Sequence, residues 1–137
     1  PRKPQTMDHP QLKIIGTLHS DIHSPKEAPK NYDISELTGT IEIAPQYLDA
    51  LDGIEKGQTV VVLCWLHQAD RKVLKVYPRG DHSRGLRGVF ATRSPARPNP
   101  IAISEFEIME RRETLLTVKG LDIIDGTPVI DIKKKIA

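Results

Sequence analysis

The stretch from Arg79 to Pro100 concentrates the residues best suited to bind an anion. It carries five arginines and a single acidic residue, Asp81, and so has a net charge of +4. The whole 137-residue chain has a net charge of only +2, too small by itself to identify a nucleic-acid-binding protein. Focused positive charge attracts phosphates and carboxylates. On charge alone, an anion-binding loop and a solvated basic loop both remain open.

Prolines stiffen the second half of this stretch, GVFATRSPARPNP. Ser94, Arg97 and Asn99 each precede a proline, which favours extended backbone at all three positions. A pre-ordered loop avoids an ordering cost of about 1–2 kcal/mol per residue on binding. We expect Arg93 and Arg97 to project toward an anion or a flat π-system, and Asn99 to read a base edge or to cap a turn. The alternative is that the prolines only prevent edge pairing and the arginines lie in solvent.

Acidic residues gather in the segment LDIIDGTPVID, which holds Asp122, Asp125 and Asp131. Its simplest interpretation is a tight Asp-Gly turn between strands. The functional alternative is that carboxylates and turn amides face a ligand with ammonium, hydroxyl or sulfonium groups. The segment does not match a calcium loop, and Cys64 is the only cysteine, so we expect neither a disulfide nor a metal site.

A third candidate lies in WLHQADR, where His67 and Gln68 follow an apolar run. Strand ends often carry ligand contacts, although a structural histidine is the alternative. The chain has no G-x-G-x-x-G after a strand and no G-x-x-x-x-G-K-[ST] loop. These absences argue against a doubly wound nucleotide-binding domain.

The segments that must position these residues read as short strands separated by turns. We expect strands over residues 12–18, 37–43, 59–66, 72–76, 87–92, 101–109, 114–120 and after Pro128, with one short helix at 45–51. The run at 59–66 is almost continuously apolar, which predicts burial on both faces. The alternation in 101–109 slips near Ser104, which predicts a bulge there. This pattern predicts an all-β fold, a closed or nearly closed barrel.

Length and composition complete the expectation. We expect residues 1–10 to be a disordered amino-terminal segment and residues 11–137 to form a single domain. Only 4% of the residues are aromatic, so the core must be mostly aliphatic, with Cys64 buried in it. No run is long enough for a membrane span and no signal-peptide pattern opens the chain, which predicts a cytoplasmic protein.

Four ordered segments of this sequence resemble the TsaA-like family. They are IIGTLHS with the later EAPKN, then VVLCWLHQADR, then YPRGD…RGVFATRSPARPNPIAIS, and finally GLDIIDGTPVIDIK. The resemblance covers nearly all the chain from Ile14 onward. It differs where Ala102 stands in place of a usual glycine, and where the chain ends in DIKKKIA.

The resemblance implies a β-barrel homodimer that uses S-adenosyl-L-methionine to methylate N6 of threonylcarbamoyladenosine, next to the anticodon of tRNA. No DNA partner is expected. The implied cofactor contacts are Asn31, His67, Gln68, Arg93, Ile103, Asp122, Ile123, Ile124 and Asp125. An alternative is a barrel that binds the cofactor or RNA without chemistry.

N6 of the acceptor is a poor nucleophile, because its lone pair is delocalised into the purine and the carbamoyl group. Withdrawal of its proton requires a base, and Asp125 and His67 are the candidate catalytic residues. The candidate RNA-binding residues are Arg79, Arg84, Arg87, Arg97 and Asn99, to which Lys133 to Lys135 add positive charge. With so few aromatics, stacking on RNA bases would fall to arginine planes or Phe90.

Overall fold

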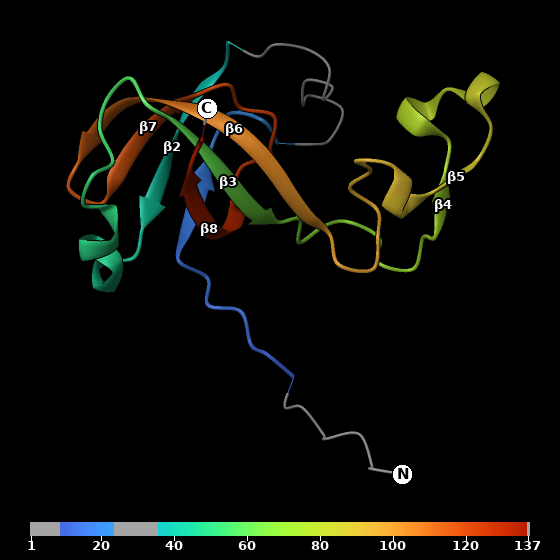
Figure 1. Cartoon of the computed structure of the whole chain (residues 1–137), viewed down its shortest axis with the longest axis horizontal. Coiled ribbons are helices and arrows are strands. Elements are labelled where there is room, and N and C mark those ends of the chain that lie inside the picture. The colour runs from blue at the N-terminus through green and yellow to red at the C-terminus, as the bar shows by residue number, and fades with distance from the viewer. Residues whose placement is uncertain (1–8, 24–35, 137) are drawn as a thin grey trace.

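The computed structural model describes residues 9–23 and 36–136, and its centre is a closed antiparallel β-barrel. Six strands close the barrel in the order β1-β2-β7-β6-β3-β8. Their bounds are β1 Gly16–His19, β2 Thr38–Ile43, β3 Thr59–Trp65, β6 Ile101–Arg112, β7 Leu115–Lys119 and β8 Thr127–Lys134. The predicted all-β barrel is therefore confirmed, although two of the eight strands lie outside the closed sheet (Figure 1).

Side chains that alternate along the strands build the barrel core. In β3, Val60, Val62 and Cys64 are fully buried while the residues between them are half-exposed. The prediction that this strand is buried on both faces is therefore wrong, because a barrel strand has only one inward face. In β6, Phe106 and Ile108 point into the same aliphatic core.

The alternation in β6 continues through Ser104, which is buried between Ala102 and Phe106. The predicted bulge at Ser104 is therefore wrong: the register shift between β6 and β7 falls between Ile108 and Glu110. The interruption of the apolar-polar alternation in the sequence is a polar residue, Ser104, on the buried face of the strand.

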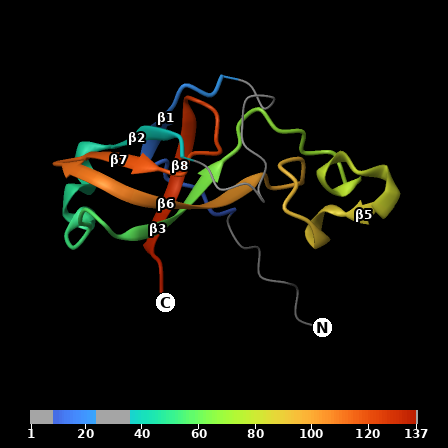
Figure 2. The ribbon, with the colours of Figure 1, turned by 90° about the horizontal axis from the view of Figure 1, so that it is seen from above.

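Residues 66–99 leave the barrel between β3 and β6 and form an extension, here called the arm (Figures 1 and 2). The arm holds a two-stranded sheet of β4 (Lys75–Val76) and β5 (Arg87–Gly88). It also holds three 3-10 turns, η3 (Pro78–Gly80), η4 (His82–Arg84) and η5 (Val89–Ala91). Both strands are shorter than predicted, since each has a single partner and the predicted strand at 87–92 turns into η5.

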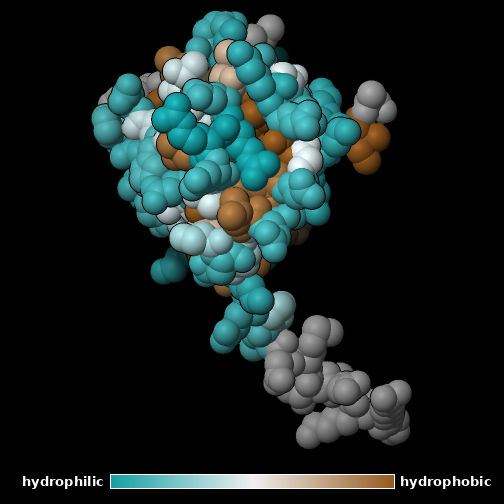
Figure 3. Space-filling view, turned by 90° about the vertical axis from the view of Figure 1, so that its left-hand side faces the viewer, coloured by the Kyte–Doolittle hydropathy of each residue, from teal (hydrophilic) through white to brown (hydrophobic). Residues whose placement is uncertain are grey.

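The remaining elements complete the barrel ends. The predicted short helix is the 3-10 helix η2 (Pro45–Leu51), with a proline in its first turn and Leu51 buried against the core. The predicted first strand shortens to β1, and the residues before it lie mainly exposed. Figure 3 shows that the barrel face turned away from the arm is mainly hydrophilic.

Candidate functional site

A cavity of about 820 Å³ lies between the barrel and the arm. Barrel residues 101–104, 122–124 and 127 line one side, together with residues 66–69 at the start of the arm and Arg93, which bonds to Ile103; this side is here called the barrel wall. The other arm residues, 76–80, 84, 91–92, 94–95 and 97, line the opposite side, here called the arm wall. The volume falls in the range of about 300–1,000 Å³ typical of small-molecule sites. Segments far apart in sequence therefore meet around a space large enough for a nucleoside.

The barrel wall presents one carboxylate, that of Asp122. The buried Ser104 hydroxyl donates to its two oxygens, Oδ1 at 3.0 Å and Oδ2 at 3.3 Å. Burial raises the pKa of Asp122, and the Ser104 hydrogen bond and the positive charge of Arg93 partly oppose that shift. Ser104 was not among the predicted site residues, because its place on an apolar face was interpreted as a bulge and not as a buried hydroxyl that requires a hydrogen-bond partner.

Arg93 lies beside this carboxylate. Its Nη2 donates to the Ile103 carbonyl at 2.9 Å, which fixes the guanidinium against the start of β6. A cation and an anion of the cavity lining therefore lie close enough for their charges to interact. This pairing complements a zwitterionic amino acid group, whose carboxylate and ammonium carry the opposite charges.

His67 and Gln68 line the cavity just after β3 ends, as their place in the sequence indicated. The chain turns there through two backbone hydrogen bonds, from Leu66 N–H to Pro100 at 2.8 Å and from Ala69 N–H to Leu66 at 3.0 Å. The side chains of Ile103 and Ile124 add apolar surface nearby, and Ile123, which also lines the cavity, is buried. Asn31 lies outside the described residues.

The Arg97 side chain bonds to the backbone of the loop that carries it. Its guanidinium donates to the carbonyls of Ser94 at 2.8 Å, Val89 at 2.6 Å and Thr92 at 2.6 Å. Its backbone N–H donates to Asp70 at 3.0 Å. Arg97 thus joins the two ends of the arm, a role that its charge alone did not reveal.

Arg71, which the sequence did not single out, holds the next part of this loop. Its Nε donates to the Pro98 carbonyl at 2.7 Å and its Nη2 to Asn99 Oδ1 at 3.2 Å. Its guanidinium also lies 5.0 Å from the centre of the Trp65 ring. The Asn99 side chain therefore has a partner within the protein.

The arm wall carries Arg79 and Arg84 on the turn that follows β4. Arg84 Nε lies 3.3 Å from Asp81 Oδ2. Asp81 in turn accepts hydrogen bonds from the Ser83 N–H and hydroxyl, which lower its pKa. Tyr77, another lining residue missed from the sequence, stacks on His82 with ring centres 3.9 Å apart.

Two other predicted residues lie elsewhere. Arg87 is exposed on β5, where its Nη1 donates to the Leu86 carbonyl at 3.2 Å. Asp125 is not one of the described lining residues of the cavity. Its carboxylate accepts from the Ser20 N–H at 2.9 Å and lies 3.7 Å from His19 Nδ1, so it holds its loop to the end of β1.

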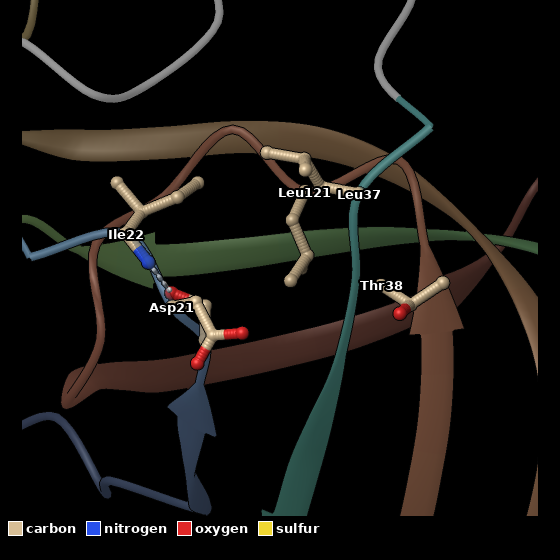
Figure 4. A pocket seen from close by; sticks show the side chains of 6 residues that line it. Asp21, Ile22, Leu37, Thr38 and Leu121 are labelled. Carbon is tan, nitrogen blue, oxygen red and sulfur yellow. Dashed lines mark hydrogen bonds between the residues drawn. The ribbon is translucent and has the colours of Figure 1, made fainter.

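A second cavity, shown in Figure 4, lies where β1 and β2 meet the loop after β7. Its volume is about 240 Å³, and Asp21, Ile22 and Leu121 are among its lining residues. That volume is below the usual range for small-molecule sites. Within residues 9–23 and 36–136, no group of three or more metal-binding side chains lies close enough to hold an ion. In the same residues, no helix is long and apolar enough to cross a membrane.

The fold and the cavity define a small β-barrel protein with a ligand-binding site between the barrel and its arm. A family described as the tRNA-methyltransferase O N-terminal domain matches residues 17–137. The chain belongs to this family.

Relatives of known name agree with this assignment. A probable S-adenosyl-L-methionine-binding protein of Methanothermobacter thermautotrophicus is 46% identical over 123 residues, covering 90% of this chain and 88% of the relative. An S-adenosyl-L-methionine-binding protein of Archaeoglobus fulgidus is 43% identical, covering 90% of this chain and 87% of the relative. The crystal structure of TrmO from Pseudomonas aeruginosa superposes with a TM-score of 0.73 at 31% identity and covers 95% of this chain. This chain spans 57% of the length of that TrmO chain.

Proposed function

We propose that this chain is an S-adenosyl-L-methionine-dependent tRNA methyltransferase acting on N6 of threonylcarbamoyladenosine next to the anticodon. The observation that carries the proposal is the cavity, whose largely apolar lining includes Asp122 and Arg93, two opposite charges that act on each other. Family membership supports the reaction class, and the names of the relatives support the cofactor.

The residues of the cavity fit this cofactor, which supplies an activated methyl group on a sulfonium. Asp122 and Arg93 would hold its amino acid end, Asp122 facing the ammonium and Arg93 the carboxylate. Gln68 offers an amide for hydrogen bonds, and Ile103, Ile123 and Ile124 offer apolar contact. Asn31 and Asp125 remain proposed contacts from family resemblance alone.

The acceptor nitrogen must lose its proton as it gains the methyl group. His67 lines the cavity, and a neutral imidazole can accept that proton. The Asp125 carboxylate instead faces the end of β1, so its support as a proton acceptor is weaker than that of His67. We therefore propose His67 as the general base.

We propose that tRNA reaches the cavity along the arm. The exposed Arg87 lies on the arm and suits a phosphate contact. The lysines at the end of β8 lie beside the start of β3, at the end of the barrel away from the arm, and would contact only a more distant part of the tRNA. Lys133 and Lys135 already pair with Asp131 at 2.9 Å and Glu105 at 3.1 Å. Alanine at both Arg84 and Arg87 is expected to weaken tRNA binding and to flatten its salt dependence. Unchanged affinity and slope would remove this pair from the RNA surface.

The homodimer is also a proposal. Phe90 and Leu74 on the arm are 85% and 66% exposed, and a second copy of the chain is one partner that would cover them. Sedimentation of the wild type and of Phe90→Ser tests this. A monomeric wild type would contradict it.

A non-catalytic binding module is the second candidate, because the archaeal relatives are named for binding and not for methyl transfer. Two measurements separate the candidates. Calorimetry with S-adenosylmethionine, in which Arg93→Ala is expected to lower affinity, tests the cavity. Methyl transfer from labelled cofactor to tRNA with and without threonylcarbamoyladenosine, followed by nucleoside mass spectrometry, tests the reaction. If the protein binds S-adenosylmethionine but transfers no methyl group to tRNA, only the non-catalytic binding module remains.

A further inference from the structure

The two walls of the cavity differ in their charged side chains. The barrel wall presents the Asp122 carboxylate, with Arg93 fixed beside it by the Ile103 carbonyl. The arm wall presents Arg79 and Arg84 from the turn after β4. A ligand that fills this cavity therefore meets cations on the arm side that are separate from the Asp122–Arg93 pair.

The turn that carries these arginines is ordered by its own contacts. Arg79 has a φ of 55°, a left-handed conformation that is unfavourable for a residue with a side chain. It persists because the surrounding turn is fixed. Asp81 accepts from the Ser83 N–H at 2.9 Å and from its hydroxyl at 2.6 Å, and Tyr77 stacks on His82.

Asp81 also orients Arg84. The 3.3 Å contact engages Arg84 Nε, and a guanidinium carries four further N–H donors on its two terminal nitrogens. Since Arg84 lines the cavity, these terminal nitrogens can serve as a planar two-pronged donor to a ligand on the arm side. Such a donor matches a carboxylate in a bidentate manner.

We propose that Arg84, with Arg79 beside it, recognises a carboxylate carried by the acceptor base itself. This inference rests on the proposed function and deepens it. The acceptor base must enter the cavity to reach the methyl group, whereas the phosphates of its strand stay on the backbone outside. The threonyl group of the proposed acceptor carries a carboxylate on the substituent of N6, so that anion enters the cavity with the reacting nitrogen. Ordinary adenosine has no such group, and these arginines therefore determine specificity.

The cofactor also has a carboxylate, to which the proposed function gives a different partner. Its ammonium and carboxylate lie on one carbon, so they need an anion and a cation close together. Asp122 and Arg93 provide that combination on the barrel wall. Arg84 pairs with an acid, Asp81, that already serves the turn.

The test measures binding of free nucleosides, which contain no phosphate, to protein saturated with S-adenosylhomocysteine. Threonylcarbamoyladenosine and its methyl ester are titrated in a calorimeter against the wild type and three variants: Arg84→Gln, Arg84→Lys and Arg112→Gln. Arg112 is the matched control, an exposed arginine with one acidic contact, 3.5 Å from Glu110, outside the cavity lining. Thermal unfolding of each variant confirms that it folds.

The wild type and Arg112→Gln are expected to bind the acid about 10- to 100-fold more tightly than the ester, as a charge-assisted hydrogen bond to a carboxylate predicts. Arg84→Gln is expected to bind acid and ester equally, and Arg84→Lys to keep part of the preference. Arg79→Asn, which tolerates the left-handed backbone, is expected to reduce the preference as well.

Equal binding of acid and ester by the wild type, or no binding of the acid, overturns the inference. So does an Arg84→Gln variant that loses affinity only for S-adenosylhomocysteine, which would assign Arg84 to the cofactor. A variant that loses only tRNA affinity would assign it to backbone phosphate. Methyl transfer to tRNA is measured on the same protein. Transfer without carboxylate preference refutes this inference alone, and carboxylate preference without transfer refutes only the proposed reaction.

Discussion

Replacing Arg97 by alanine should loosen the arm without unfolding the barrel. The guanidinium of Arg97 donates to three carbonyls, those of Val89, Thr92 and Ser94, at 2.6, 2.6 and 2.8 Å. A hydrogen bond from a charged donor contributes about 1.5–3 kcal/mol. These carbonyls lie in a partly exposed loop and can bond water once the side chain is removed. We therefore expect a total loss of about 2–3 kcal/mol rather than the full sum.

Native-state hydrogen exchange measures this loss locally. The amides of Thr92, Ser94 and Arg97 are bonded to Val89 O, Thr92 Oγ and Asp70 O. Their exchange should accelerate about 30- to 150-fold in Arg97→Ala, since each 1.4 kcal/mol is a factor of ten. Amides of the barrel strands should exchange as in the wild type. Affinity for S-adenosylmethionine should fall as well, because Arg93 belongs to the loosened loop.

Arg97→Lys is the control for charge. A lysine keeps the positive charge but replaces the planar fork with a single ammonium, so it should restore little of the protection. If arm amides exchange normally in Arg97→Ala while the salt dependence of tRNA binding flattens, Arg97 contacts RNA and the role argued here is refuted.

Three further predictions concern the barrel side of the site. Burial raises the pKa of Asp122, so Asp122→Asn, which removes the buried charge but keeps an accepting oxygen, should stabilise the ligand-free protein in urea unfolding and weaken cofactor binding in calorimetry. Burial, with a smaller contribution from the charge of Asp122, raises the pKa of the Cys64 thiol from its usual 9.0 to about 12. The unfolded thiol therefore ionises first, and stability should fall by about 1.4 kcal/mol per pH unit between the two values. That part of the pH dependence should be missing from Cys64→Ala. Asp125→Asn should keep methyl transfer within a few-fold of wild type while His67→Gln loses about 100-fold; the opposite ranking would make Asp125 the proton acceptor.

The barrel strands were predictable because their signal is local. Alternation along residues 38–43 and 101–109 and the apolar run from residue 59 mark the strands, and the observed strands begin within one residue of the predicted positions. The arm strands are shorter than predicted, because strand-forming side chains do not make a strand where no partner strand is available. Val89 and Phe90 have strand-forming side chains, but the closed barrel offers this segment no edge to pair with, so it turns into η5.

The cavity was only partly predictable. His67, Gln68, Arg93 and Asp122 all line it, as their motifs suggested. Spacing could not decide between Asp122 and Asp125, because the loop that holds them has no regular period. The structure gives their carboxylates different partners, the Ser104 hydroxyl for Asp122 and the Ser20 N–H for Asp125.

The coupling of prolines and arginines in the arm has one physical origin. Of residues 66–99, all of which the structure describes, only Val89 is buried among the hydrophobic side chains, so apolar packing contributes little to their order. Prolines restrict the backbone, but each lacks a backbone N–H. A proline-rich loop therefore has more carbonyl acceptors than N–H donors, and no neighbouring strand supplies the missing donors. Arg97 and Arg71 donate to those carbonyls at Ser94 and Pro98. Arg71 and Arg97 therefore stabilise the arm through hydrogen bonds to its own backbone. We infer that an arm ordered in this way can hold Arg79 and Arg84 at the cavity.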